Sequence, residues 1–138
     1  MNKALPIVVL LLIAGAATWF VRDRIRLRPD PQVEQFQTDA DNLITGLQQY
    51  KEFVGKYPEG NLVEVAKALS GQTEKKVLIL ATSKNQKNAK GEIIDPWGTP
   101  LQFYFAQNGV MIRSAGPNKV FEDSRVRGAD DLYRTETK

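Results

Sequence analysis

Apolar residues recur at steps of three and four between Gln32 and Lys56, which is the spacing that lines one face of an α-helix. The members of this stripe are Val33, Phe36, Ala40, Leu43, Leu47, Tyr50 and Val54. Gly55 and Pro58 follow as stop signals. A continuous apolar stripe has to be buried, so we expect a long amphipathic helix packed on a core. Contact with a partner helix is the alternative use of the same stripe.

An uncharged run from Ala4 to Val21 precedes this helix. Its length is close to the roughly 20 apolar residues that cross a bilayer. Trp19 and Phe20 stand where an interfacial aromatic belt is expected, so the run predicts a membrane anchor. Two alternatives are a cleavable signal peptide, processed at Ala14-Gly15-Ala16, and a buried core helix.

A basic segment and a proline pair separate this run from the rest of the chain. Pro29-Asp30-Pro31 interrupts the helical pattern, and the arginines before it are Arg22, Arg24, Arg26 and Arg28. We therefore expect an anchor with a basic flank over residues 1–28 and one globular domain over residues 29–138. Anionic headgroups attract such a flank, whereas the positive-inside rule favours a cytoplasmic position for the domain that follows it.

Shorter elements are expected after the long helix. Leu62–Leu69 predicts a second helix, with Gly71 as its cap. The VLIL run within Lys76–Ala81 predicts either a short strand or the end of an apolar helix. Pro96–Pro100 predicts a turn, in which Asp95 caps the backbone and a tryptophan fills core volume.

A hairpin is expected near the C-terminal end. Leu101–Ala106 and Val110–Ser114 flank the turn signal Asn108-Gly109, so they predict two antiparallel strands. From Gly116 onward the chain is expected to be a polar loop. Together the elements predict an α+β fold, with an N-terminal hydrophobic helix and a long amphipathic helix packed on a small antiparallel sheet.

Composition excludes several classes of chemistry. The 138 residues include no cysteine and no histidine, which excludes disulfides, thiol nucleophiles, Cys-ligated zinc and the usual general base. The net charge of +3 comes with no basic face interleaved with aromatics, so no nucleic-acid partner is expected. The acidic residues Glu122, Asp123, Asp130 and Asp131 leave three interpretations: a solvated loop, a calcium site or a glycosidase-like carboxylate pair.

Several motifs together resemble the globular domain of the major (G-type) pseudopilins of the type II secretion system. Lys56-Tyr57-Pro58 closes the long helix, and Asp95-Pro96-Trp97-Gly98-Thr99-Pro100 follows far downstream. Ser114-Ala115-Gly116-Pro117-Asn118 and Asp130-Asp131-Leu132 extend the resemblance, which covers roughly residues 37–134. It implies a pilin-like fold, a long helix packed on a small antiparallel sheet.

The resemblance also implies a calcium ion in the loop after the hairpin. Its side-chain ligands would be Asn118, Asp123, Asp130 and Asp131, with backbone carbonyls near Ala115 and Val120 as further oxygens. Hard oxygen ligands without histidine are what calcium prefers. One feature of prepilins is missing, since no acidic residue and no processing motif occurs between Met1 and Val21.

The resemblance implies a structural subunit and not an enzyme. Its partners would be other pilin-like subunits or further copies of itself, together with the bacterial inner membrane, with the domain in the periplasm. No nucleic acid and no small-molecule substrate are expected. The alternative is a stand-alone exported or envelope binding module that reuses the pilin-like fold, and the missing processing motif motivates it.

Overall fold

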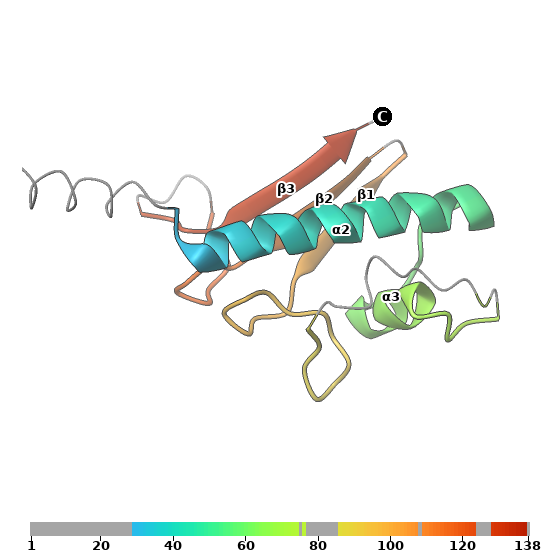
Figure 1. Ribbon diagram of the computed structural model, residues 1–138, viewed down its shortest axis with the longest axis horizontal. Helices are drawn as coiled ribbons and strands as arrows, with labels where there is room; N and C mark the ends of the chain where they lie inside the picture. Colours follow the sequence, from blue (N-terminus) through green and yellow to red (C-terminus); the bar gives the residue numbers. More distant parts are fainter. Residues whose placement is uncertain (1–28, 75, 77–85, 108, 124–127, 138) are drawn as a thin grey trace, which may run out of the picture. The chain divides into compact units, whose positions relative to one another are not determined.

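A computed structural model describes residues 29–74, 76, 86–107, 109–123 and 128–137. The chain divides between Asp30 and Pro31, and all the elements below belong to Pro31–Lys138. They are α2 (Pro31–Val54), α3 (Leu62–Leu69), β1 (Gln102–Ala106), β2 (Gly109–Ser114) and β3 (Leu132–Thr137) (Figure 1). The expectations for residues 1–28, the VLIL run and the turn residue Asn108 lie outside the described residues. Among the described helices, none has the length and apolar character to cross a bilayer.

The long helix α2 confirms the prediction made from the apolar stripe. Its core-facing side chains are almost fully buried, namely Phe36, Ala40, Leu43, Ile44, Leu47 and Tyr50. The helix ends at Val54, where Gly55 adopts a φ of 90° and its N–H donates to the Lys51 carbonyl at 2.7 Å. A positive φ is open to glycine without a Cβ penalty, so the stop falls where the sequence places it.

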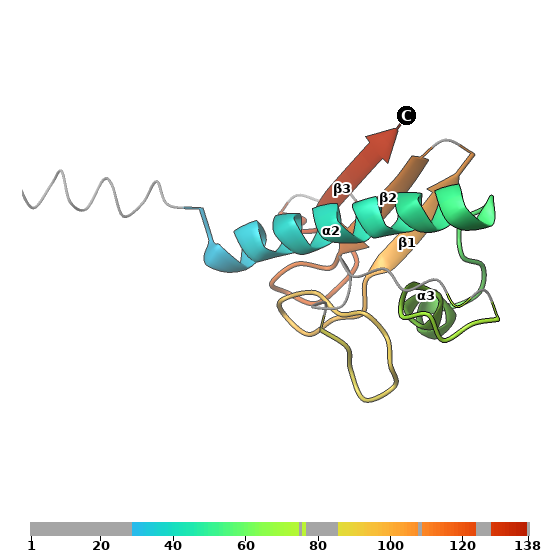
Figure 2. The ribbon, with the colours of Figure 1, turned by 45° about the vertical axis from the view of Figure 1, so that its right-hand side comes forward.

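The short helix α3 has the predicted bounds and a complete N-terminal cap. The Asn61 side chain accepts hydrogen bonds from the backbone N–H groups of Val63 and Glu64 at 3.0 and 3.1 Å. The Glu64 carboxylate in turn accepts from the Asn61 N–H, which closes a capping box. At the other end Gly71 has a φ of 70°, as expected of the predicted cap. Figure 2 shows α3 below the C-terminal half of α2.

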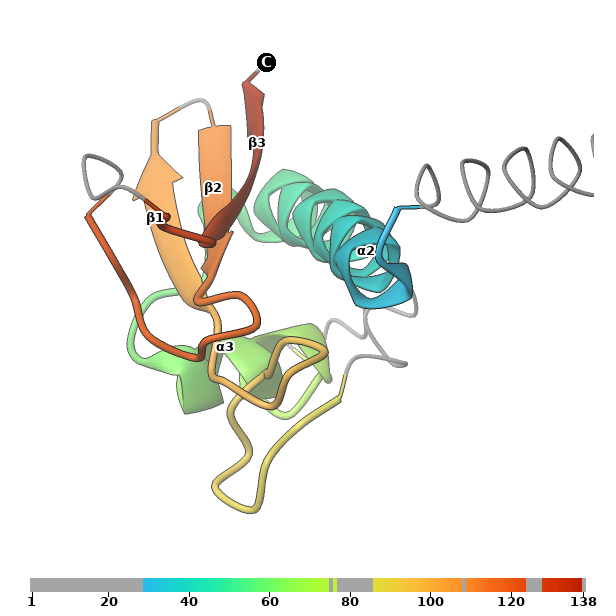
Figure 3. The ribbon, with the colours of Figure 1, turned by 90° about the vertical axis from the view of Figure 1, so that its left-hand side faces the viewer.

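The three strands form an antiparallel sheet in the order β1-β2-β3, and α2 packs against β2 and β3 (Figure 3). The buried side chains of β2 alternate, with Val110 and Ile112 in the core. The opposite face of the sheet carries Tyr104, Met111 and Thr135, which are directly paired across the strands. The architecture is therefore α+β, as predicted: one long helix on a small antiparallel sheet.

The prediction that the chain is a loop from Gly116 onward is wrong at its C-terminal end. Leu132–Thr137 forms β3, whose register along β2 runs from Gly109 opposite Thr137 to Ser114 opposite Leu132. The segment is polar and largely exposed, because β3 lies at the edge of the sheet. An edge strand can carry polar side chains on both faces, so its sequence lacks the clear apolar alternation of the hairpin strands.

Candidate metal centre

The loop that joins β2 to β3 brings three carboxylates together. Glu122, Asp130 and Asp131 each contribute a carboxylate oxygen, and these oxygens lie within 4.8 Å of one another. Calcium binds oxygen ligands at about 2.3–2.6 Å, so oxygens on opposite sides of one ion are roughly 5 Å apart. The spacing of the three oxygens fits a single cation of this size.

Asp130 contributes a carboxylate oxygen that lacks a partner. Its Oδ2 accepts a hydrogen bond from the Asn118 backbone N–H at 3.1 Å. Its Oδ1 is buried and has no hydrogen-bond partner among the described residues. Leaving a buried acceptor unsatisfied costs free energy, and a bound cation would remove that cost.

The backbone of Gly116 lies directly against Asp130. Gly116 has a φ of +67°, and a Cβ at this position would lie only 2.3 Å from the Asp130 backbone oxygen. The N–H of Lys119 donates to the Gly116 carbonyl at 3.1 Å, which closes a tight turn. The glycine therefore allows the two ends of the loop to approach each other.

Asp131 already has a cationic partner. Its side chain is 2% exposed and pairs with Arg113, whose Nε donates to Asp131 Oδ2 at 2.5 Å. The rings of Phe121 and Tyr133 lie over the guanidinium, with centroids 5.1 and 5.4 Å away. Burial lowers the pKa of Arg113, but hydrogen bonds with Tyr104 and Asp131 outweigh burial, so the pKa is raised and the charge persists at neutral pH.

Asn118 lies beside the three carboxylates, and its side chain is used within the loop. Its Oδ1 accepts from the Val120 N–H at 2.7 Å, and its Nδ2 donates to Glu122 at 3.0 Å. In this arrangement the Asn118 side chain orients the Glu122 carboxylate. Of the two residues expected to offer carbonyls, Ala115 is buried and Val120 is exposed on the loop surface.

The third carboxylate of the cluster is that of Glu122, whereas the resemblance implies its neighbour Asp123 as a ligand. Asp123 is exposed and is not one of the three clustered carboxylates. The Glu122 N–H donates to both carboxylate oxygens of Asp131 at 3.3 Å, which fixes the backbone of this segment beside the cluster. No signal in the sequence distinguishes two adjacent acidic residues in a loop, because the choice depends on the local backbone conformation.

A buried polar network holds the start of the loop. Asp95 is 1% exposed, and its Oδ1 accepts from the N–H groups of Trp97 and Thr99 at 3.0 and 2.8 Å, which confirms its predicted capping role. Its Oδ2 accepts from the Ser114 hydroxyl at 2.7 Å. The same hydroxyl oxygen accepts from the Gly116 N–H at 3.0 Å. Asp95 therefore links the turn after β-bridge residue Ile94 to the first turn of the acidic loop.

The donor set suits a hard divalent cation. Three carboxylates and the Arg113 guanidinium leave two negative charges at the cluster, which a divalent ion would neutralise. Oxygen ligands without nitrogen or sulfur favour calcium or magnesium over transition metals. Asp130 Oδ1, buried and without a hydrogen-bond partner among the described residues, leaves one acceptor of this carboxylate unused.

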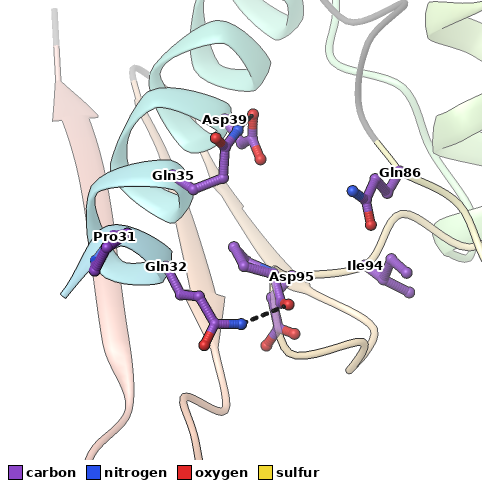
Figure 4. A pocket seen from close by; sticks show the side chains of 8 residues that line it. Pro31, Gln32, Gln35, Asp39, Gln86, Ile94 and Asp95 are labelled. Carbon is purple, nitrogen blue, oxygen red and sulfur yellow. Dashed lines mark hydrogen bonds between the residues drawn. The ribbon is translucent and has the colours of Figure 1, made fainter.

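A shallow cavity of about 270 Å³ lies elsewhere, beside the start of α2 (Figure 4). Its polar lining comes from Gln32, Gln35, Asp39, Gln86 and Asp95. Gln32 donates to the Pro96 carbonyl at 3.0 Å and Gln35 to Asp39 at 2.8 Å, so these amides bond within the wall of the cavity. The Gln32 bond secures α2 to the turn at Pro96.

Comparisons of the chain with models of known protein families, with characterised proteins and with solved structures gave no match.

Proposed function

We propose that this chain is a structural, pseudopilin-like subunit of a type II secretion or type IV pilus-like system, anchored in the bacterial inner membrane with its domain in the periplasm. The observation that carries the proposal is the combination of α2 on a three-stranded antiparallel sheet with an acidic loop between β2 and β3. The motifs around Tyr57-Pro58 and Asp95–Pro100 support it, since both resemble those of the major pseudopilins.

The work of such a subunit is assembly. The apolar run from Ala4 to Val21 would insert in the bilayer and pack laterally against the corresponding runs of other pilin-like subunits. The globular domain would present the acidic loop at its surface. Nothing in this role requires a substrate, a nucleophile or a general base.

Calcium would act here as a structural cross-link. Asp130, Glu122 and Asp131 would hold it, and the ion would supply positive charge that joins the two ends of the β2–β3 loop. Asn118 would orient Glu122 through its amide, and Arg113 would hold Asp131 in place. A loop fixed in this way is stabilised by an amount that grows with calcium concentration.

Thermal unfolding with calcium and with chelator tests the metal site. We expect calcium to raise the Tm of the native chain, and Asp130→Asn or Glu122→Gln to abolish most of that rise. Asp131 is unsuitable as the diagnostic residue, because its loss also breaks the ion pair with Arg113. Asp123→Asn is the matched control and should keep the calcium response. An equal response in all three variants would exclude the clustered carboxylates as the ligands.

Assembly is tested separately, by deletion of the chain from its host and by co-purification from membranes. The proposal expects impaired secretion or pilus formation and recovery of the chain with other pilin-like subunits. Normal secretion and an isolated chain would favour the alternative, a stand-alone envelope binding module.

A further inference from the structure

β3 is an edge strand that is open on one side within the described part of the chain. The sheet order β1-β2-β3 gives β3 a single neighbour among the described strands, and α2 packs against β2 and β3 (Figures 1 and 3). Residues 133–136 are all exposed. An exposed edge presents unpaired backbone N–H and C=O groups, which makes it a template for another strand.

The side chains of β3 place opposite charges two residues apart on one face. Arg134 and Glu136 lie on the side of the strand that faces α2, where Arg134 pairs with Asp41. Tyr133 and Thr135 alternate with them on the other face. Two opposite charges separated by one residue are complementary to a copy of themselves that runs antiparallel.

We propose that β3 pairs antiparallel with β3 of a second copy of this chain, with Thr135 opposite Thr135 on a two-fold axis. In this register Arg134 of each copy lies opposite Glu136 of the other, which gives two oppositely charged pairs per dimer. The two sheets would join into one of six strands. The contact is isologous, so it closes at two copies.

The neighbouring register is disfavoured by charge. Residues directly opposite each other in an antiparallel pair have their side chains on the same face of the sheet. Even-numbered residues of β3 must therefore pair with even-numbered residues of the second copy, and the nearest alternative register centres on Arg134. It would place Arg134 opposite Arg134 and leave Glu136 opposite Leu132. Like charges directly opposite each other destabilise a strand pair, so the sequence favours the register centred on Thr135.

Arg134 has the capacity for two carboxylates. It donates to Asp41 through Nε at 2.5 Å and through Nη2 at 2.8 Å. A guanidinium has five N–H donors, so others remain for Glu136 of the second copy. The hydrogen bond and the charge of Asp41 raise the pKa of Arg134, which keeps the guanidinium charged at neutral pH.

A cysteine at the two-fold axis gives a direct test, because the chain contains no cysteine of its own. In the full-length chain in detergent, Thr135→Cys should form a covalent dimer on mild oxidation or with a short bifunctional maleimide. Thr38→Cys on the exposed side of α2 is the matched control. It reports random collision and any association through the N-terminal run, and it should cross-link much less.

Charge reversal tests the register. Added to Thr135→Cys, either Glu136→Arg or Arg134→Glu should lower cross-linking about tenfold, because each places like charges opposite each other. A mixture of the two variants should restore cross-linking, since each charge then meets its opposite. Far-ultraviolet circular dichroism checks that each variant is folded. Equal cross-linking at positions 135 and 38, or no recovery in the mixture, would overturn the proposal.

Discussion

Gly116 is the residue at which the backbone of the acidic loop comes closest to itself. Its φ of +67° is one that only glycine adopts readily, and the space where a Cβ would stand is already occupied by the Asp130 carbonyl. Gly55 has a similar φ of +90°, but no atom lies within 4 Å of its Cβ position. A comparison of alanine substitutions at the two glycines therefore distinguishes the cost of a positive φ from the cost of a steric clash at the Cβ.

Gly116→Ala should lower the free energy of unfolding by about 3 kcal/mol, whereas Gly55→Ala should lower it by about 1 kcal/mol. The difference reports the displacement of Asp130 that a methyl group requires. Urea unfolding in chelator measures both values without any contribution from calcium. Equal losses at the two positions would mean that the loop moves aside at no cost.

The site could be predicted only in part from its residues. Asp130 and Asp131 are both clustered acids, as the resemblance implies. Asp131 is held by Arg113, whereas Asp130 keeps a buried oxygen that has no partner in the described part of the loop. Their different environments depend on Arg113, which lies 18 positions away on β2. A residue pattern in the loop alone carries no information on that distant partner.

Two ion pairs join elements of the fold, and they differ in burial. Asp41 on α2 pairs with Arg134 on β3, with side chains 49% and 44% exposed. Asp131 pairs with Arg113 on β2, with side chains 2% and 17% exposed. Exposed pairs contribute little and are screened by salt, whereas removal of one partner from a buried pair leaves an uncompensated charge.

Asp131→Asn should therefore lower the free energy of unfolding by about 3 kcal/mol in chelator, with little dependence on salt. Asp41→Asn should have a smaller effect. This effect should disappear in 1 M salt, because the Debye length is then about 3 Å and exposed charges are screened from each other. Urea unfolding at low and high salt distinguishes the two. The order of the two effects would be reversed if the surface pair, and not the buried pair, held β3 in place.

Elements with one apolar face were predictable, and the element without one was not. The sequence shows where these elements are buried or capped. The signals are the apolar stripe of α2, the cap residues of α3 and the aromatic alternation of the hairpin. β3 is held by backbone hydrogen bonds to β2 and by the ion pair between Arg134 and Asp41. Such contacts involve residue types that are equally common in loops, so the strand left no periodic signal.

On the scale of the whole molecule, the core that the described residues form lies within Pro31–Lys138. The buried apolar residues come from α2, α3, the segment around Ile93, and the hairpin, and they form one cluster. Residues 31–138 expressed alone should therefore unfold in a single cooperative transition, with coincident circular dichroism and fluorescence curves. Two separate transitions would show that the core is more than one cooperative unit, and an unfolded domain would show that residues 1–30 contribute to its stability.

The buried link through Asp95 gives this domain its own optical reporter. Residues 31–138 contain a single tryptophan, Trp97, whose backbone N–H is bonded to Asp95. The same carboxylate holds Ser114, which holds the N–H of Gly116 beneath the acidic loop. Three hydrogen-bonded groups therefore connect the loop to the backbone of a residue whose indole is half-buried. The emission spectrum of Trp97 should shift whenever the loop changes its state.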